Sequence, residues 1–415
     1  MSTHALTSRW LPIALINFLI AAIFGLTLRF AFVVELPWIK YTNVLHAHSH
    51  VAMLGWLHVG IYLLIIRFFL DNKSSLRAYH RILLGTQITV VGMAISFAIQ
   101  GYSPLSIAFS TLHTFLCYWF LIILKRDLKR GASRNSDSEK LLYLGCFFMV
   151  LSTLAIYLIP VCIATGLRQS ALYYASIQFY LHFQFNGWYI FVLLAVLFKI
   201  LETRNIPLDA RRVKYFITLL TISCLLTYAL AVTWSTPVPM LFIINSTGVV
   251  LQLAAVILLI YVLYKALFNR HLFPKNINLY LGIAGISWVL KVAIQTAVIV
   301  PYLATVGYTL RNFVIGFLHL LLLGMATTAV LAFLNFERKN SFPNSLKVGM
   351  VVLITGIVLS EITLFIQGIL LWTGHGFLPG YYGLIFSLSS LLPLGVAILI
   401  YWAYREHVRL NSLQV

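Results

Sequence analysis

Acidic residues are scarce in this 415-residue sequence, which has 10 aspartate and glutamate residues against 29 lysine and arginine residues. Charged residues of all kinds make up 9% of the chain, whereas hydrophobic residues make up 61%. A water-soluble domain needs far more charge to cover its surface, so the composition excludes an ordinary soluble protein. No stretch has the composition of a soluble domain, and we expect residues 1–415 to form a single integral membrane domain.

Cysteine is also rare, and the four cysteines stand singly, at Cys117, Cys146, Cys162 and Cys224. No CxxC or CxxCH motif is present, which excludes a disulfide framework and a c-type haem attachment. The first apolar stretch is too long for the core of a signal peptide and lacks a small-residue cleavage site. We therefore expect it to be a retained helix.

Long apolar runs, by contrast, fill most of the chain. About twenty apolar residues cross about 30 Å of hydrocarbon as a helix, and runs of this length predict helices rather than barrel strands. We expect an all-α polytopic membrane protein with twelve transmembrane helices. The predicted spans lie near residues 10–34, 44–70, 81–100, 104–124, 140–166, 171–201, 211–234, 239–268, 277–301, 310–335, 344–373 and 380–404.

The net charge of +19 would suggest a nucleic-acid partner in a soluble protein. Here most of the lysine and arginine residues fall at the N-terminus, in alternate loops and at the C-terminus. This distribution predicts that both termini are cytoplasmic and that the partner is the lipid bilayer, with no nucleic acid. A multi-pass protein of the bacterial inner (plasma) membrane is the expected location.

Three histidines, His46, His48 and His50, open the second predicted span. Histidine is costly to bring toward hydrocarbon and is the commonest metal ligand, so this cluster indicates metal or haem ligation. His46 and His50 are spaced i, i+4 and share a helix face, whereas His48 points away from both. Which of the three is a ligand is left open, with His50 or His48 preferred.

Further histidines lie in the fourth, sixth and tenth spans. Counted from the predicted outer ends at the helical rise, His50, His113, His182 and His319 lie about 9, 13, 16 and 13 Å deep, and thus form a layer. His58, deeper in the second span, is the exception. His113 fits a hydrogen-bonding packing role equally well, whereas His319, embedded in leucines, favours a ligand role.

The cofactor predicted from this layer is haem b, copper, or both. Haem iron suits two imidazoles from facing helices, while copper or zinc takes three or four nitrogens that converge. A haem also brings two carboxylates, for which Arg311 and Arg29 near the outer surface are candidate partners. The alternative for Arg29 is an arginine that extends to the lipid headgroups.

Two charged residues fall well inside predicted spans. Lys291 is the only lysine far from both membrane surfaces, and Glu361 is the only acidic residue within a span. Because isolated buried charges are expensive, we expect these intramembrane charges to form an ion pair. Such residues also mark proton paths or cofactor contacts, so a functional role stands beside the structural one.

The twelve spans, with outer-face histidines on the second, sixth and tenth, resemble the catalytic subunit of the haem-copper oxidase superfamily. The resemblance implies a haem bound between helices 2 and 10, by His48 or His50 and by His319, with His182 where helix 6 supplies a copper ligand. Phe317 and Leu321 stand where the second helix 10 histidine would be, and helix 7 has no histidine pair. A full oxygen reductase is therefore not expected.

The His-Ala-His entry to an early helix, and a later histidine followed by a glycine-containing apolar run, are similar to the NnrS-like branch. This resemblance implies haem, with copper as an option, a small gas or redox ligand such as nitric oxide, and an electron donor that the sequence does not identify. If the protein is an enzyme, it is oxidoreductase-like. A proton-coupled secondary transporter and a non-catalytic haem or copper sensor remain the alternatives.

Overall fold

The computed structural model of the protein describes residues 2–71, 74–130, 136–267, 273–337 and 342–412. These described residues form helices and connecting turns, with no β-strand among them. Twelve of the helical segments are long and apolar enough to cross a membrane, and they match the twelve predicted spans one for one. The protein is therefore an all-α multi-pass membrane protein, as predicted from the sequence.

Large apolar side chains lie on the outer surface of many spans. Ile88, Ile99 and Ile122, for example, are 64%, 70% and 68% exposed. Contiguous apolar surface of this kind is rare on a soluble monomer but is the surface that lipid tails cover. The exposed residues thus support the same assignment as the hydropathy of the spans.

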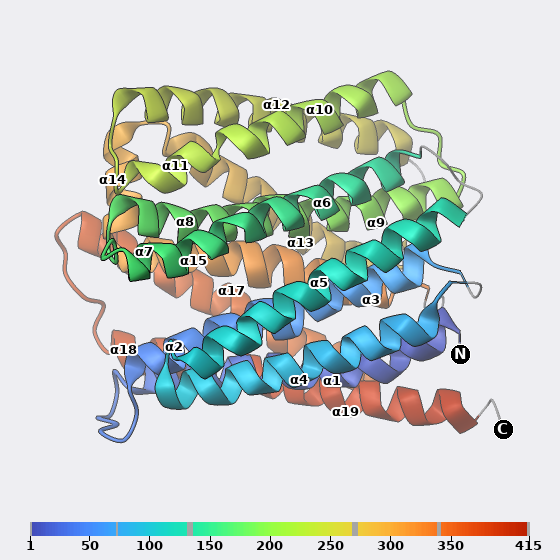
Figure 1. The fold of residues 1–415 in the computed structure, drawn as a ribbon, viewed down its shortest axis with the longest axis horizontal. Helices are drawn as coiled ribbons and strands as arrows, with labels where there is room; N and C mark the ends of the chain where they lie inside the picture. Colours follow the sequence, from blue (N-terminus) through green and yellow to red (C-terminus); the bar gives the residue numbers. More distant parts are fainter. Residues whose placement is uncertain (1, 72–73, 131–135, 268–272, 338–341, 413–415) are drawn as a thin grey trace. The chain divides into compact units, whose positions relative to one another are not determined.

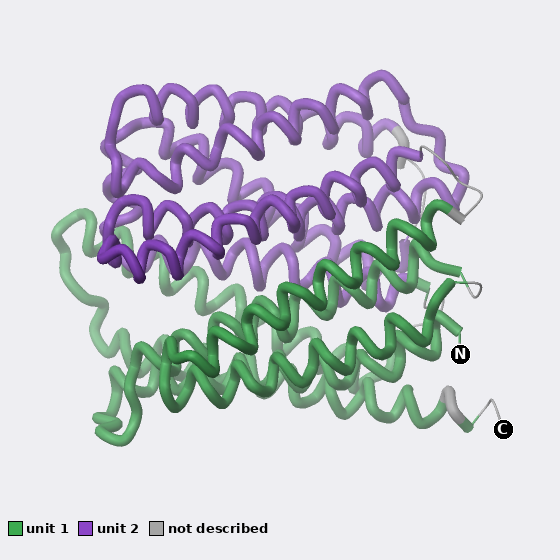
Figure 2. Tube along the Cα trace, in the orientation of Figure 1, with its two compact units in different colours: residues 1–132, 337–415 green, residues 133–336 purple. Residues whose placement is uncertain are grey.

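The first four and last two spans form one compact unit, residues 1–132 and 337–415, here called unit 1 (Figure 2). Its helices are α1 (Thr3–Phe30), α2 (Tyr41–His50), the π-helical segment η1 (Val51–Leu57), α3 (His58–Phe69), α4 (Leu76–Gln100), α5 (Pro104–Arg130), α17 (Asn344–Trp372), α18 (Tyr381–Ser389) and α19 (Leu391–Ser412). α2, η1 and α3 together make one continuous span. α1 begins and α19 ends at the same end of this unit (Figure 1), in agreement with an even number of spans.

The six spans between them form unit 2, residues 133–336. Its helices are α6 (Asp137–Leu154), η2 (Ala155–Tyr157), α7 (Leu158–Ala164), α8 (Ala171–His182), η3 (Phe183–Tyr189), α9 (Ile190–Thr203), α10 (Ala210–Leu226), α11 (Tyr228–Thr233), α12 (Pro239–Leu267), α13 (Lys275–Ala297), α14 (Pro301–Thr309), α15 (Arg311–His319), η4 (Leu320–Thr327) and α16 (Thr328–Leu334). The single membrane domain over 1–415 stays a prediction.

Three spans contain a π-helical segment, and each segment begins directly after a histidine. η1 follows His50, η3 follows His182 and η4 follows His319. π-helical hydrogen bonds join residues five apart, so the chain turns less per residue than in an α-helix, and such segments are frequent at functional sites. These three spans are also the most buried. In their apolar 18-residue stretches 83%, 89% and 67% of the residues are buried, against 50% or less in the other spans of the described chain.

Side chains from neighbouring helices hold the first π-helical segment. Asn17 of α1 donates from Nδ2 to the Gly55 carbonyl (3.0 Å) and to Gln87 Oε1 (2.8 Å), and Gln87 Nε2 donates back to Asn17 Oδ1 (3.0 Å). Backbone groups within a membrane need a protein partner, because lipid offers none. The amide pair therefore fixes η1 against α1 and α4, and so fixes the start of α3.

Candidate metal centre

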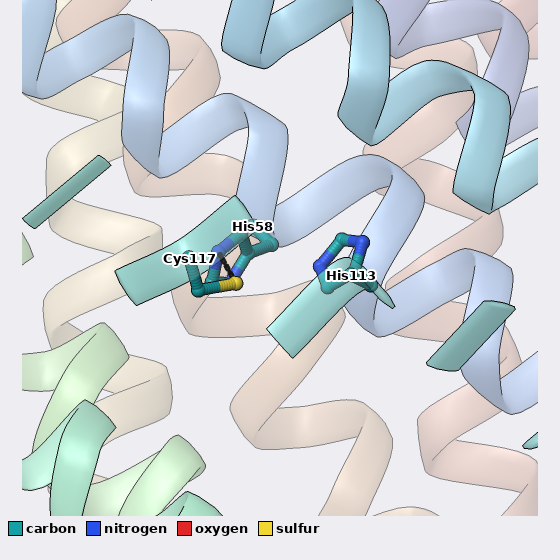
Figure 3. Close-up of side chains that lie close together, drawn as sticks. All are labelled: His58, His113 and Cys117. Carbon is teal, nitrogen blue, oxygen red and sulfur yellow. Dashed lines mark hydrogen bonds between the residues drawn. The ribbon is translucent and has the colours of Figure 1, made fainter. Parts of the chain in front are cut away.

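His58, His113 and Cys117 converge in unit 1, at the contact between α3 and α5 (Figure 3). One ligand atom from each of the three lies within 4.8 Å of the others. The closest pair is His58 Nε2 and Cys117 Sγ, 3.2 Å apart, and the rings of His58 and His113 are 5.3 Å apart between centroids. The three side chains are 1%, 2% and 4% exposed, so the cluster is enclosed by protein.

The local sequence explains why these side chains meet. His113 and Cys117 are spaced i, i+4 on α5, which places both on one face of that helix. His58 is the first residue of α3, directly after η1, so the slower turn of the π-helical segment decides which way its ring points. The i, i+4 pair and the π-helical segment together build the site.

A hydrogen-bond chain sets the tautomer of His113. Thr89 of α4 donates its hydroxyl proton to the Thr86 carbonyl at 2.7 Å, and its oxygen lies 3.1 Å from His113 Nδ1. Since a hydroxyl has a single proton, Thr89 accepts at that contact and His113 Nδ1 carries the hydrogen. Nε2 then holds the lone pair, and this buried atom has no hydrogen-bond partner among the described residues.

Aromatic rings wall the other side of the cluster. Tyr62, one turn beyond His58, packs edge-on against its ring at 4.5 Å and stacks on Phe120 of α5 at 3.6 Å. The buried Tyr79 ring of α4 packs edge-on against Phe120 at 5.3 Å. This wall excludes bulk water from the ligand atoms, so any ion bound there meets a low dielectric.

The atom set fits a transition metal. Thiolate and imidazole bond to zinc at about 2.3 and 2.0 Å, and in a tetrahedral site such ligands lie about 3.5 Å apart. The 3.2 Å and 4.8 Å limits of the observed cluster bracket that separation. Soft thiolate with two imidazoles suits copper or zinc rather than a hard, oxygen-binding cation.

The histidines at the entrance of the second span occupy two faces of α2, as predicted. His46 and His50 both pack against Phe97 and Tyr102, and His50 stacks on Phe97 at 4.0 Å between centroids. His48 faces α1 instead, where its Nδ1 lies 2.8 Å from the Ala21 carbonyl.

His48 and His50 share one tautomer. His50 Nδ1 lies 2.8 Å from the His46 carbonyl, and His48 Nδ1 is bonded to the Ala21 carbonyl in the same way. A carbonyl can only accept, so Nδ1 carries the hydrogen in both rings and Nε2 holds the lone pair. This is the form that a haem iron or a copper ion binds, so both residues fit a ligand role.

His182 has a different environment in unit 2. Its Nε2 lies 2.8 Å from the Cys224 carbonyl, and Asn186 Nδ2 lies 3.3 Å from its Nδ1. Gln184, two residues further along the chain, donates to Ser152 at 2.9 Å. His182 and Gln184 thus both have partners on neighbouring helices of unit 2, and both ring nitrogens of His182 take part.

The remaining haem candidates lie in separate places. His319 ends α15 of unit 2 and is half-buried, while Arg311 is exposed at the start of the same helix. Arg29 lies in the last turn of α1 in unit 1. A haem held by His319 with His48 or His50, and the propionate contacts of both arginines, stay predictions because they join the two units.

Both intramembrane charges are buried. Lys291 of α13 is 0% exposed, and it interacts electrostatically with His182 and Cys224. Within the described part of unit 2, no group accepts a hydrogen bond from its Nζ. Glu361 is buried in α17 of unit 1, so the predicted ion pair also joins the two units and stays a prediction.

Two signals in the sequence indicate features that the predictions omitted. His113 and Cys117 form a His-x3-Cys pair on one predicted span, although the prediction treats each cysteine as isolated. In addition, a glycine follows five residues after His50, His182 and His319, at Gly55, Gly187 and Gly324. A Cβ at those glycines would lie 2.8, 2.4 and 2.8 Å from neighbouring side-chain atoms, so each π-helical segment packs closely on an adjacent helix.

The predicted depths set His58 apart from the other histidines, whereas the structure places its ring beside that of His113. Depth gives only a distance along the membrane normal, and neighbouring helices also differ in direction and rotation.

No protein-family model and no curated protein matches this sequence. The geometry of unit 1 is therefore the main guide to function.

Proposed function

We propose that this chain is a bacterial inner-membrane metalloprotein whose transition-metal centre is formed by His58, His113 and Cys117. Its proposed role is redox chemistry or electron transfer, with a small gas such as nitric oxide as the ligand suggested by the resemblance of the histidine motifs. One observation supports the metal centre above all. Three enclosed side chains of the types that bind copper and zinc bring their ligand atoms within 4.8 Å of one another.

The contrast between two buried histidines supports a ligand role over simple packing. Both nitrogens of His182 have protein partners, as expected for a histidine that serves structure. His113 has Thr89 at Nδ1, while its buried Nε2 has no hydrogen-bond partner in the described chain. Leaving such an atom unsatisfied within a membrane is costly, and a metal ion would satisfy it.

Haem is a second candidate cofactor, favoured by a separate observation. His48 and His50 each donate Nδ1–H to a backbone carbonyl, which leaves Nε2 in the form that binds iron. The proposed haem b has one of them and His319 as axial ligands and an unidentified electron donor. A haem would supply one-electron chemistry, and these residues would hold and orient it.

Metal analysis and an absorption spectrum of the detergent-purified full chain test both proposals. We expect one transition-metal ion per chain in addition to any haem iron, and we expect this ion to be lost in Cys117→Ser and in His113→Ala. Cys162→Ser is the matched control, because Cys162 is equally buried but stands outside the cluster, and it should keep the metal. Wild-type protein without any bound transition metal would contradict the metal centre.

The haem proposal has its own readout in the same sample. A Soret band that is lost or shifted in His319→Ala, and in His48→Ala or His50→Ala, is the expected result. A spectrum without a Soret band would end the haem proposal and leave the metal centre standing. A Soret band that survives all three substitutions would place the haem elsewhere.

A further inference from the structure

The charge around the metal centre distinguishes between metals. The stretches 41–66, 82–100 and 104–124, which form the helices around the cluster, contain no Asp, Glu, Lys or Arg. The ligand set itself is two neutral imidazoles and one thiol. These three stretches therefore supply no charge that compensates a net charge on a bound ion.

We propose that the His58, His113 and Cys117 site binds monovalent copper, Cu(I), as an electrically neutral three-coordinate complex. This rests on the proposed metal centre and specifies which ion that centre takes. On binding, the S–H bond of Cys117 breaks, a Cu–S bond forms, and the proton passes to solvent. The Cu(I) ion replaces the thiol proton, so the net charge of the site stays the same, and no electron is transferred.

Burial of the site makes the replacement of the Cys117 thiol proton selective for a monovalent ion. A divalent ion that displaces the same proton leaves the complex with a net positive charge, and a charge in a low-dielectric interior is strongly unfavourable unless it is paired. The stretches around the site supply no carboxylate to pair with it. Zn(II) and Cu(II) therefore carry an electrostatic penalty that Cu(I) does not.

The number of available ligands also favours Cu(I). Structural zinc is almost always held by four protein ligands in a tetrahedron, whereas soft thiolate sites with few ligands suit Cu(I). The cluster has three members among the described residues. The hydroxyl of Thr89 already donates to Thr86 and accepts from His113, so it is not available as a fourth ligand.

A competition titration of the metal-free, detergent-purified full chain tests the proposal. Cu(I) under reductant, Ag(I) as a redox-inert monovalent analogue, and Zn(II) are each titrated against a chromogenic chelator of known affinity. We expect one Cu(I) or one Ag(I) per chain, with Zn(II) binding at least about 100-fold more weakly. Cys117→Ser should abolish Cu(I) binding, and Cys162→Ser should retain it.

The outcomes of this titration distinguish a failure of the Cu(I) assignment from a failure of the proposed metal centre. Binding of Zn(II) as tight as that of Cu(I) would overturn the Cu(I) assignment while the metal centre stands. Absence of binding by every ion would overturn the metal centre itself. Cu(I) binding that survives Cys117→Ser would overturn the assignment of these three residues as the copper site, since the copper would then be held by other side chains.

Discussion

Thr89 accepts a hydrogen bond from His113 Nδ1 across 3.1 Å, because its own proton is donated to a backbone carbonyl. This contact orients the imidazole and leaves the lone pair on the buried Nε2. Contacts that orient a metal-binding histidine in this way commonly affect metal affinity about 10- to 100-fold. Thr89 is therefore a positioning residue for the proposed metal centre.

Thr89→Val keeps the shape of the side chain but removes the acceptor. We expect a loss in metal affinity of about 10- to 100-fold, measured by the chelator competition, because Nδ1–H is left unsatisfied and the ring is free to turn. Thr89→Ser retains the hydroxyl and should retain most of the affinity. Equal affinity in the wild-type and valine proteins would show that Thr89 does not position His113.

Gly25→Ala tests the packing of His48 against α1. A Cβ at Gly25 would lie 2.8 Å from Cε1 of His48, so the ring must move. We expect this overpacking to lower the free energy of unfolding by about 1–3 kcal/mol, measured by thermal or denaturant unfolding in detergent. If His48 binds haem, the same variant should also shift the absorption spectrum.

The matched control for this substitution is Gly282→Ala in α13. A Cβ at Gly282 meets nothing within 4 Å, so alanine should be neutral or stabilise its helix by up to about 1 kcal/mol. A Gly25→Ala protein as stable as this control would mean that His48 has room to move.

Lys291→Met tests the state of the buried charge in unit 2. Since no described group of unit 2 accepts from Lys291 Nζ, we expect an apolar side chain of similar length to stabilise the protein by about 1–4 kcal/mol in thermal unfolding. Lys291→Arg keeps the charge and should show no such gain.

Destabilisation by Lys291→Met would instead favour the ion pair predicted with Glu361. A double-mutant cycle with Glu361→Gln then measures the coupling directly, because the two single effects would fail to add. A loss of proton-coupled solute uptake in proteoliposomes, with no loss of metal, would favour the transporter alternative.

The start of α10 offers a test of pH dependence outside the membrane spans. Asp209 accepts from the Arg212 backbone N–H at 3.1 Å and pairs with the Arg212 guanidinium at 2.6 Å. The backbone hydrogen bond, followed by the guanidinium charge, lowers the pKa of the Asp209 carboxyl below its ordinary value of 3.8. A lowered pKa means that the cap stabilises the helix above the unfolded-state pKa and is lost as pH falls through the lower folded-state value.

We therefore expect the protection factor of the Arg212 amide, which is its exchange rate corrected for the intrinsic effect of pH, to fall below about pH 4 in hydrogen-exchange measurements. Asp209→Asn keeps a side-chain acceptor but not the titrating charge, so this protection factor should vary much less with acid. Equal acid sensitivity in both proteins would mean that another group controls the end of the helix.

Local patterns in the sequence were sufficient to identify the membrane spans and the faces of α2. Apolar run length predicted all twelve spans, because crossing hydrocarbon is a requirement on each segment by itself. Helical spacing placed His46 and His50 together against Phe97, with His48 on another face, because these three residues lie within one regular α-helix.

The cluster of His58, His113 and Cys117 could not be derived in the same way. His58 lies beyond the seven π-helical residues of η1, where a turn of 3.6 residues no longer gives the direction of a side chain. The pair of His113 and Cys117 on one helix face was visible in the sequence, but its partner belongs to a different span.

By itself, then, the sequence determined that this protein is a bundle of twelve membrane helices with histidines inside it. The tertiary structure decided that His58, rather than a histidine of the entrance cluster, lies beside His113 and Cys117. The physical reason is that hydropathy and face are properties of single helices, whereas a metal centre depends on how neighbouring helices rotate and pack. In this protein, the π-helical segment after His50 sets that rotation for α3.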